Sequence, residues 1–300
     1  MDAQKKSSQD QLGDFVHLHL HSEYSLLDGG NKIDPLLEKV KEFGMGAVAI
    51  TDHGNLHGAF EFFNKAKKHG VKPIFGIEAY VAPADRTDRK PTGVRDGGFH
   101  LVLLAENILG WNNLVKLSSD AFLKGFYYKP RMDHSTLEEF GEGIIAINGH
   151  LGSSIAYYLC KFVENGNGEH WQAAVKEAAW HKKVFAPNRD GEPRFYIELQ
   201  RHSVQEQLAI NPHLIKLANE LDIPLVCDND AHYLTEKDWD SHDTLCCISM
   251  QKTKSDPDRI TYPRDLYVKS PAQMCELFED VPESVENTVR IAQRCNVELD

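Results

Sequence analysis

The stretch FVHLHLHSEYSLLDG, residues 15–29, decides the fold because histidines and apolar residues alternate along its first half. Successive side chains of a β-strand point to opposite faces, so His17, His19 and His21 are expected to share one face. Histidine is the commonest metal ligand and is costly to bury unpaired, and Asp28 follows seven residues after His21. The stretch therefore predicts a strand that carries half of a metal site.

The composition is that of a folded α/β protein with one substantial domain or two small ones. The chain has 300 residues, of which 41% are hydrophobic, and its six cysteines include no C-x-x-C pair. The sequence has no secretory signal and no apolar run of about 18 residues, which favours a cytoplasmic protein without a membrane partner. The net charge of −12 argues against tight binding of a bare phosphate backbone unless bound cations or another domain assist.

Strand-like runs alternate with helical patterns along the chain. The runs are residues 15–21, 46–52, 72–81, 99–105, 143–148, 194–200 and 223–230, with helical spacing over 33–43, 60–66 and 204–221 between some of them. Such alternation predicts a parallel sheet covered by helices on both faces. A closed barrel fits best, and an open doubly wound sheet is the alternative.

Three segments are expected along the chain. Residues 1–13 are polar and without periodicity, which predicts a flexible tail. Residues 14–270 hold the seven runs and form the barrel domain. Residues 271–300 carry two helical patterns, around 272–278 and 283–295, which form a C-terminal helical segment.

Metal-competent side chains occur at one strand end after another. They are His19, His21, Asp28, Asp52, His53, Glu78, His100, His150, Glu198, Asp230 and His232. In α/β barrels the carboxyl ends of the strands converge on one mouth, so these groups are expected to meet there. Asp52, beside His53, is expected to orient a neighbour or cap a helix rather than bind metal. The remaining histidines are expected to have ordinary roles: His57, His69, His134, His170, His181, His202, His213 and His242.

Six imidazoles and three carboxylates are too many ligands for one zinc ion, which takes four, but they suit two or three divalent ions that share ligands. Clustered divalent ions activate water and clamp phosphoryl oxygens, which points to phosphoester hydrolysis. A serine nucleophile elbow, a P-loop and a G-x-G-x-x-G motif are all missing after the strand-like runs. The sequence therefore lacks the motifs that serine-based hydrolysis and nucleotide triphosphate chemistry require.

Several motifs resemble those of the PHP (polymerase and histidinol phosphatase) superfamily, and within it the N-terminal domain of the bacterial C-family replicative DNA polymerases. They are HLHLHSEYSLLDG (17–29), AITDHGN (49–55), GIEAYV (76–81), FHLVLLAEN (99–107), NGHLG (148–152) and CDNDAHY (227–233). YYKPRMD (127–133), FYIELQRH (195–202) and residues 269–300 also resemble the polymerase rather than a free-standing phosphatase.

The resemblance implies a distorted (β/α)7 barrel of the TIM-like PHP type, with two or three zinc, manganese or iron ions. The nine implied metal ligands, which are also the implied catalytic residues, are His19, His21, Asp28, His53, Glu78, His100, His150, Asp230 and His232. His17 is not expected to bind metal. His150 stands where many polymerase members have cysteine, which implies retained ligation with a changed metal preference.

The complete ligand set implies a 3′–5′ exonuclease that proofreads DNA 3′ ends, single-stranded or mispaired. Its partners would be the remainder of the polymerase alpha subunit and other replisome subunits. A phosphatase of the histidinol phosphate type and a metal-stabilised structural domain that supports the polymerase are the alternatives. Lys129 and Arg131 are expected either to contact backbone phosphate or to be ordinary surface cations. Asp228 forms a D-x-D pair with Asp230, which we do not interpret as a polymerase palm motif.

Overall fold

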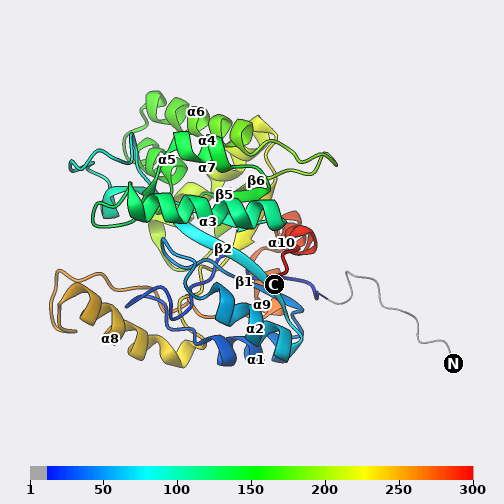
Figure 1. Cartoon of the computed structure of the whole chain (residues 1–300). Helices are drawn as coiled ribbons and strands as arrows, with labels where there is room; N and C mark the ends of the chain where they lie inside the picture. Colours follow the sequence, from blue (N-terminus) through cyan, green and yellow to red (C-terminus); the bar gives the residue numbers. More distant parts are fainter. Residues whose placement is uncertain (1–11, 300) are drawn as a thin grey trace.

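Buried strands form a curled sheet that is wrapped by helices (Figure 1). The computed structural model describes residues 12–299. The tail expected over residues 1–13 lies outside these residues, except for Leu12, which is buried, and Gly13. In the described part of the chain, no helix is long and apolar enough to cross a membrane.

The elements follow the expected alternation. The strands are β1 Ala47–Ile50, β2 Lys72–Val81, β3 Phe99–Ala105, β4 Arg131–Met132, β5 Ile144–Asn148, β6 Phe195–Gln200 and β7 Leu225–Asp228. The helices are α1 Ile33–Glu42, α2 Ala59–His69, α3 Ile108–Leu123, α4 His134–Phe140, α5 Ser154–Asn165, α6 Gly168–Val184, α7 Gln205–Leu221, α8 Trp239–Met250, α9 Pro271–Leu277 and α10 Pro282–Arg294, with short 3₁₀ turns η1 Arg95–Gly97 and η2 Glu236–Asp238. Six of the seven predicted strands are therefore present, and β4 is an addition.

The sheet runs in the order β1-β2-β3-β5-β6-β7, with β4 beside β2. The expectation of an all-parallel sheet is wrong for β3, which pairs antiparallel with both β2 and β5. This reversal places the first residues of β3, including His100, at the edge where the parallel strands end. The one metal-competent residue predicted at the start of a strand thereby reaches the same rim as the others.

The predicted first strand, residues 15–21, is extended but does not form a regular ladder. It lies between β1 and the end of β7: Ala49 donates to the His17 carbonyl (2.9 Å), and His21 donates to the Ala231 carbonyl (3.0 Å). Side chains take the place of the missing ladder. Asp228 Oδ2 accepts from the backbone N–H groups of Leu18 (2.6 Å) and His19 (3.0 Å). The barrel is thus closed by an irregular segment, which makes it distorted.

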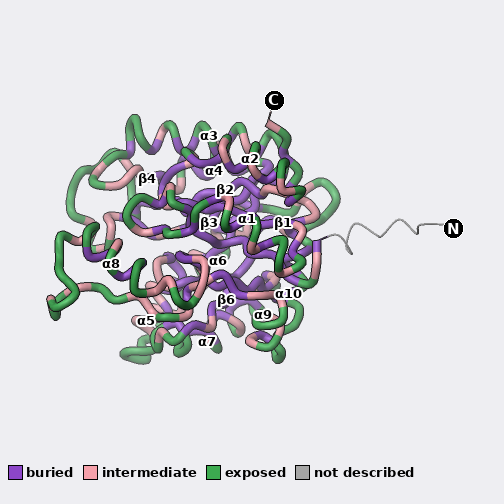
Figure 2. Tube along the Cα trace, turned by 90° about the horizontal axis from the view of Figure 1, so that it is seen from below, coloured by how far each residue is buried: buried purple, intermediate pink, exposed green. Residues whose placement is uncertain are grey.

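The barrel interior is apolar at one end and polar at the other. One buried cluster takes residues from every long strand, such as Ile74, Val102 and Val226, and from α10, but none from the other helices. Two residues further along the same strand faces stand Glu198 and Asp228, after Tyr196 and Val226. Figure 2 shows the buried strands enclosed by helices whose outer turns are exposed. The apolar floor therefore supports a rim of ionisable groups.

Helix α10 closes the apolar end of the barrel. Its Asn287 side chain donates to the Leu225 carbonyl at the start of β7 (2.7 Å). The Lys72 ammonium, at the start of β2, donates to the Ala292 carbonyl (2.6 Å). Thr288 Oγ1 accepts from the backbone N–H of Val16 (3.1 Å). The helix predicted in the C-terminal segment thus packs directly against the strands, while the domain division at residue 270 stays a prediction.

Local signals set the ends of two helices. Helix α2 ends at Gly70, whose φ of 70° is the left-handed conformation that glycine adopts without strain. Helix α9 begins with a capping box formed by Ser270 and Gln273, and Pro271 occupies its first position. These caps fix the chain direction after the barrel strands.

Asp228→Asn tests whether this carboxylate holds the first segment in place. We expect a loss of about 2 kcal/mol in the free energy of unfolding, because one amide oxygen cannot replace a carboxylate that accepts several buried backbone N–H groups. Urea unfolding in chelator-containing buffer measures the loss. The exposed Asp222, which follows helix α7, provides the control Asp222→Asn. Equal stability of the two variants would contradict the role of Asp228.

Candidate metal centre

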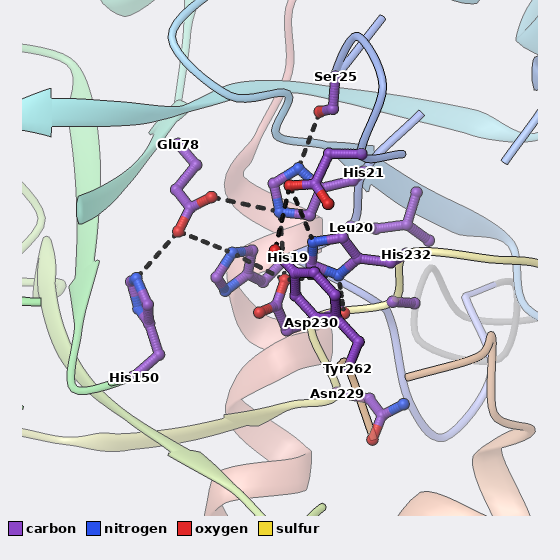
Figure 3. Close-up of polar contacts among 12 residues, drawn as sticks. His19, Leu20, His21, Ser25, Glu78, His150, Asn229, Asp230, His232 and Tyr262 are labelled. Carbon is purple, nitrogen blue, oxygen red and sulfur yellow. Dashed lines mark hydrogen bonds and ion pairs between the residues drawn. The ribbon is translucent and has the colours of Figure 1, made fainter. Parts of the chain in front are cut away.

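The nine predicted ligands meet at the polar rim of the barrel. His19 and His21 come from the closing segment, Asp28 from the loop after it and His53 from the turn after β1. Glu78 lies on β2 and His100 on β3, and the chain after β5 and β7 supplies His150, Asp230 and His232. Figure 3 shows His19, His21 and His150 turned toward Glu78. The structure thus brings all nine groups together.

Glu78 lies at the centre of this cluster and is 2% exposed. Its Oε2 lies 2.6 Å from His53 Nδ1 and 3.3 Å from His21 Nε2. Its Oε1 lies 2.8 Å from His100 Nδ1, 3.0 Å from His150 Nε2 and 3.5 Å from His19 Nε2. One carboxylate therefore contacts five imidazoles that come from four different segments.

The two aspartates flank Glu78 on one side of the cluster. Asp230 Oδ1 lies 3.3 Å from His19 Nε2 and 3.1 Å from His21 Nε2. Asp28 Oδ2 lies 2.9 Å from His53 Nε2 and 3.9 Å from His232 Nε2. Asp230 has a φ of 49°, a left-handed conformation that Asp and Asn tolerate better than other side chains. The backbone thus turns sharply at the point that aims this carboxylate into the cluster.

Many of the converging atoms are buried and lack a hydrogen bond. They are His19 Nε2, His21 Nε2, His53 Nδ1, Glu78 Oε2, His150 Nε2 and Asp230 Oδ1. Native proteins rarely leave buried polar atoms unsatisfied, and a gathering of them indicates an absent ligand. These are nitrogen and carboxylate lone pairs, the donors that divalent transition metals prefer. The residues present therefore fit a metal centre.

The geometry suits more than one ion. Within the described residues, four sets of three drawn from the nine predicted ligands have their donor atoms within 4.8 Å of one another: His21–His53–His232, His19–His21–Asp230, His19–Glu78–His150 and His53–Glu78–His100. A fifth set joins Asp28 to two residues outside the nine, His242 and Cys246. His19, His21, His53 and Glu78 each belong to two sets. Shared ligands of this kind allow neighbouring ions to be bridged.

A carboxylate outside the nine ligands holds two of the imidazoles in fixed orientations. Glu198 lies within 3.0 Å of His19 Nδ1 through Oε1 and within 3.1 Å of His150 Nδ1 through Oε2, and Gln200 donates to it. Both histidines then present Nε2 to the cluster. A carboxylate behind a metal-binding histidine fixes its ring and raises its basicity. Glu198 is thus a supporting residue that lies behind the ligands.

Asp52 binds two serines, one of which links it to His21. Asp52 accepts hydrogen bonds from the Ser22 hydroxyl (2.7 Å) and the Ser25 hydroxyl (2.7 Å). Ser25 Oγ lies 2.9 Å from His21 Nδ1, so His21 also directs Nε2 into the cluster. Asp52 thus reaches His21 through Ser25, which agrees with the expectation that it orients a neighbour.

Charges in the cluster depend on one another. Burial disfavours the ionised form of Glu78, but His53 and His100 outweigh it and hold the pKa of this carboxyl well below its usual value. Burial likewise disfavours protonation of His150, yet Glu198 and Glu78 raise its pKa from 6.5 to about 9. For His232 burial prevails and lowers the pKa to about 4. Without cations, protonated imidazoles must therefore balance the carboxylates.

Sequence reasoning missed three residues that surround Asp28. His242 was expected to be ordinary, but its Nε2 lies 2.8 Å from the Asp28 carbonyl oxygen. Cys246 Sγ lies 3.7 Å from Asp28 Oδ1, and the Tyr262 hydroxyl lies 3.4 Å from Asp28 Oδ2. The spacing of His242 and Cys246 by one helical turn on α8 was the available signal.

Three other expectations about polar residues have different outcomes. His17 lies outside the cluster, as expected, because its ring contacts Asp228 (3.4 Å) and the Lys269 carbonyl (2.9 Å). The expectation that it shares a face with the other two histidines is therefore wrong, since the segment is irregular. The surface roles considered for Arg131 are wrong as well: it is fully buried and donates to the carbonyls of Gly125 and Arg86. The Lys129 ammonium lies over the Tyr80 ring.

A model of the PHP domain family matches residues 17–202. Among relatives, the chain is 43% identical over 283 residues to the DNA polymerase III subunit alpha of Borreliella burgdorferi. This alignment covers 94% of this chain and 24% of the relative. The subunits of Campylobacter jejuni and Thermus aquaticus are 43% and 42% identical, and cover 96% and 95% of this chain. The chain spans about a quarter of the length of these relatives.

Solved structures with similar backbones are more distant. An amidohydrolase from Chromobacterium violaceum has 13% identity and a TM-score of 0.43, with 72% of this chain and 87% of that chain covered. A two-domain protein from Bacteroides vulgatus that contains a predicted PHP-like metal-dependent phosphoesterase has 14% identity and a TM-score of 0.41, with coverage of 95% and 71%.

The pKa of His150 predicts how the stability of the metal-free protein depends on pH. A proton held more tightly by the folded state stabilises it fully below the unfolded pKa of 6.5 and no longer does so above the folded pKa of about 9. The metal-free protein should therefore lose roughly 3 kcal/mol between pH 6.5 and 9. Urea unfolding with chelator across this range measures the loss. Stability that rises with pH in the metal-free protein would contradict it.

Glu198→Gln tests the supporting role of this carboxylate. We expect the affinity for Mn²⁺ or Zn²⁺ to fall about 10- to 100-fold, because His19 and His150 lose the group that orients them. Competition with a chromophoric chelator measures the affinity. Glu177, a glutamate on α6 whose Oε1 lies 3.3 Å from His134, supplies the matched control Glu177→Gln. A similar loss in both variants would count against a specific role for Glu198.

Proposed function

The chain belongs to the PHP domain family, and on this basis we propose that it is the metal-dependent 3′–5′ exonuclease domain of a bacterial DNA polymerase III alpha subunit. The reaction would be hydrolysis of the terminal DNA phosphodiester, so that a misincorporated nucleotide is removed. The observation that carries the proposal is the convergence of nine metal-competent groups, six of which leave a buried donor or acceptor atom unsatisfied.

The ligands would be the six imidazoles and three carboxylates of the cluster. Two or three divalent ions, zinc, manganese or iron, would supply Lewis acidity and activate water for attack on phosphorus. The chain itself positions the donors: Glu198 and Ser25 fix the rings of His19 and His21. The buried interior below Glu78 keeps water out of the apolar side of the cluster.

The substrate proposal rests on the relatives and on charge. Relatives that cover nearly the whole chain are subunits of a DNA polymerase, which favours DNA over a small phosphate ester. Three carboxylates facing three divalent cations leave a local charge of about +3, because −3 and +6 add, and this pocket would attract a phosphate despite the net charge of −12. The remainder of the subunit would hold the duplex, and a frayed 3′ end would enter the pocket.

Asp230→Asn provides the decisive test of activity. The wild-type chain, supplied with Mn²⁺ or Zn²⁺, should release mononucleotides from single-stranded DNA and from a mispaired primer. The variant should be at least about 100-fold slower, because it removes a carboxylate that faces His19 and His21. Asn keeps the left-handed backbone at this position, so the fold should persist, and the melting temperature of the metal-free variant checks this.

Other outcomes separate the alternatives. Turnover of histidinol phosphate without release of nucleotides would replace the exonuclease with a small-molecule phosphatase. If no substrate is consumed while chelation lowers the melting temperature, the metal has a structural role. Asp222→Asn, at an exposed position outside the cluster with the same backbone conformation, serves as the matched control for the substitution itself.

A further inference from the structure

An open apolar groove of about 830 Å³ lies between α2 and α3, away from the metal centre. Its floor and walls include Phe60 on α2 and Ile108, Trp111, Val115 and Phe122 on α3. Phe60 is 64% exposed and Ile108 is 53% exposed, and Leu123 at the end of α3 is 81% exposed. Large apolar side chains gathered in this way on one surface indicate a binding site for a partner.

The apolar residues of α3 form two separate stripes. Leu114, Leu117 and Ala121 are buried against the barrel, as expected for a helix that covers a sheet. Ile108, Val115 and Phe122 are spaced by seven residues and line the groove on another face. A helix that packs only against the sheet needs one apolar stripe. The second stripe stays partly exposed in the described part of the chain: Ile108 is 53%, Val115 40% and Phe122 39% exposed.

The lining of the groove favours a protein segment over nucleic acid. Its other members are Leu56, His57, Ala59, Asn112, Ser118, Ser119, Leu123, Glu298 and Leu299. Among these described residues there is no lysine or arginine, and the one formal charge is that of Glu298. A nucleic-acid surface would carry cations for the phosphates. Amphipathic helices dock into grooves of this apolar kind.

The relatives identify the occupant. The matching subunits are about four times as long as this chain, so most of their length lies outside the region that this chain represents. Leu299 is one of the residues that line the groove, and Figure 2 shows the C-terminal end of the chain close to α2 and α3. We propose that the groove between α2 and α3 is the docking site for the remaining part of the same alpha subunit, through an apolar segment of that part. This inference rests on the proposed assignment to the alpha subunit.

Maleimide labelling of Leu123→Cys tests the proposal. The labelling rate is compared in the 300-residue chain and in the full-length subunit, and peptide mass spectrometry reads position 123 separately from the native cysteines, of which Cys160 and Cys275 are partly exposed. We expect labelling to be at least about tenfold slower in the full-length subunit. Val163→Cys on α5, 42% exposed and outside the groove, is the matched control and should react at similar rates in both proteins.

Any other result would contradict the proposed docking site. Equal labelling of Leu123→Cys in both proteins would show an open groove, and equal protection of both positions would show burial that is not specific to it. Protection in the 300-residue chain that grows with its concentration would assign the groove to a second copy. The labelling does not depend on nuclease activity, so it separates this inference from the reaction proposed above. An endogenous protein no longer than this chain would overturn the assignment to the subunit as well.

Discussion

The buried carboxylate of Glu78 is the constraint on which the rest of the rim depends. A glutamate that is almost fully buried must be compensated by positive charge, and five imidazoles surround it within 3.5 Å. Imidazoles can compensate a carboxylate as cations or by sharing a metal ion with it. Compensation by protonated imidazoles requires pKa values well above 6.5 for groups such as His19 and His150. Compensation through a shared metal ion requires deprotonated rings. Protons and metal ions therefore compete for the same centre.

The barrel satisfies this constraint because its inner face changes character along each strand. Residues such as Val102 and Tyr196 form an apolar floor. On the same strand faces and two residues nearer the rim stand His100, which precedes Val102, and Glu198, which follows Tyr196. The reversal of β3 keeps this order, since His100 begins its strand at the edge where β6 ends. A polar cluster is thus held on a rigid apolar base, which keeps the donor atoms in register.

Much of the fold and the positions of the candidate ligands could be predicted from periodicity and from residue type at strand ends. The nine groups lie among the metal-competent side chains at strand ends, such as Glu78 in an apolar strand, and the resemblance to the PHP superfamily separated them from Glu198. The direction of β3 could not be predicted, because an apolar run reads the same in both directions. The contacts of His242 and Cys246 with Asp28 depend on how α8 folds back over the rim, which no local pattern encodes.

The irregular first segment also could not be predicted, because Asp228 stabilises it from more than 200 positions away in the chain. Helix α10 adds a second distant restraint, since Thr288 binds the backbone of Val16. During synthesis, His19 and His21 leave the ribosome well before the helix that closes the barrel beneath them. A nascent chain therefore exposes its histidines long before it can retain an ion in the finished geometry, and cation capture is a late event of its maturation.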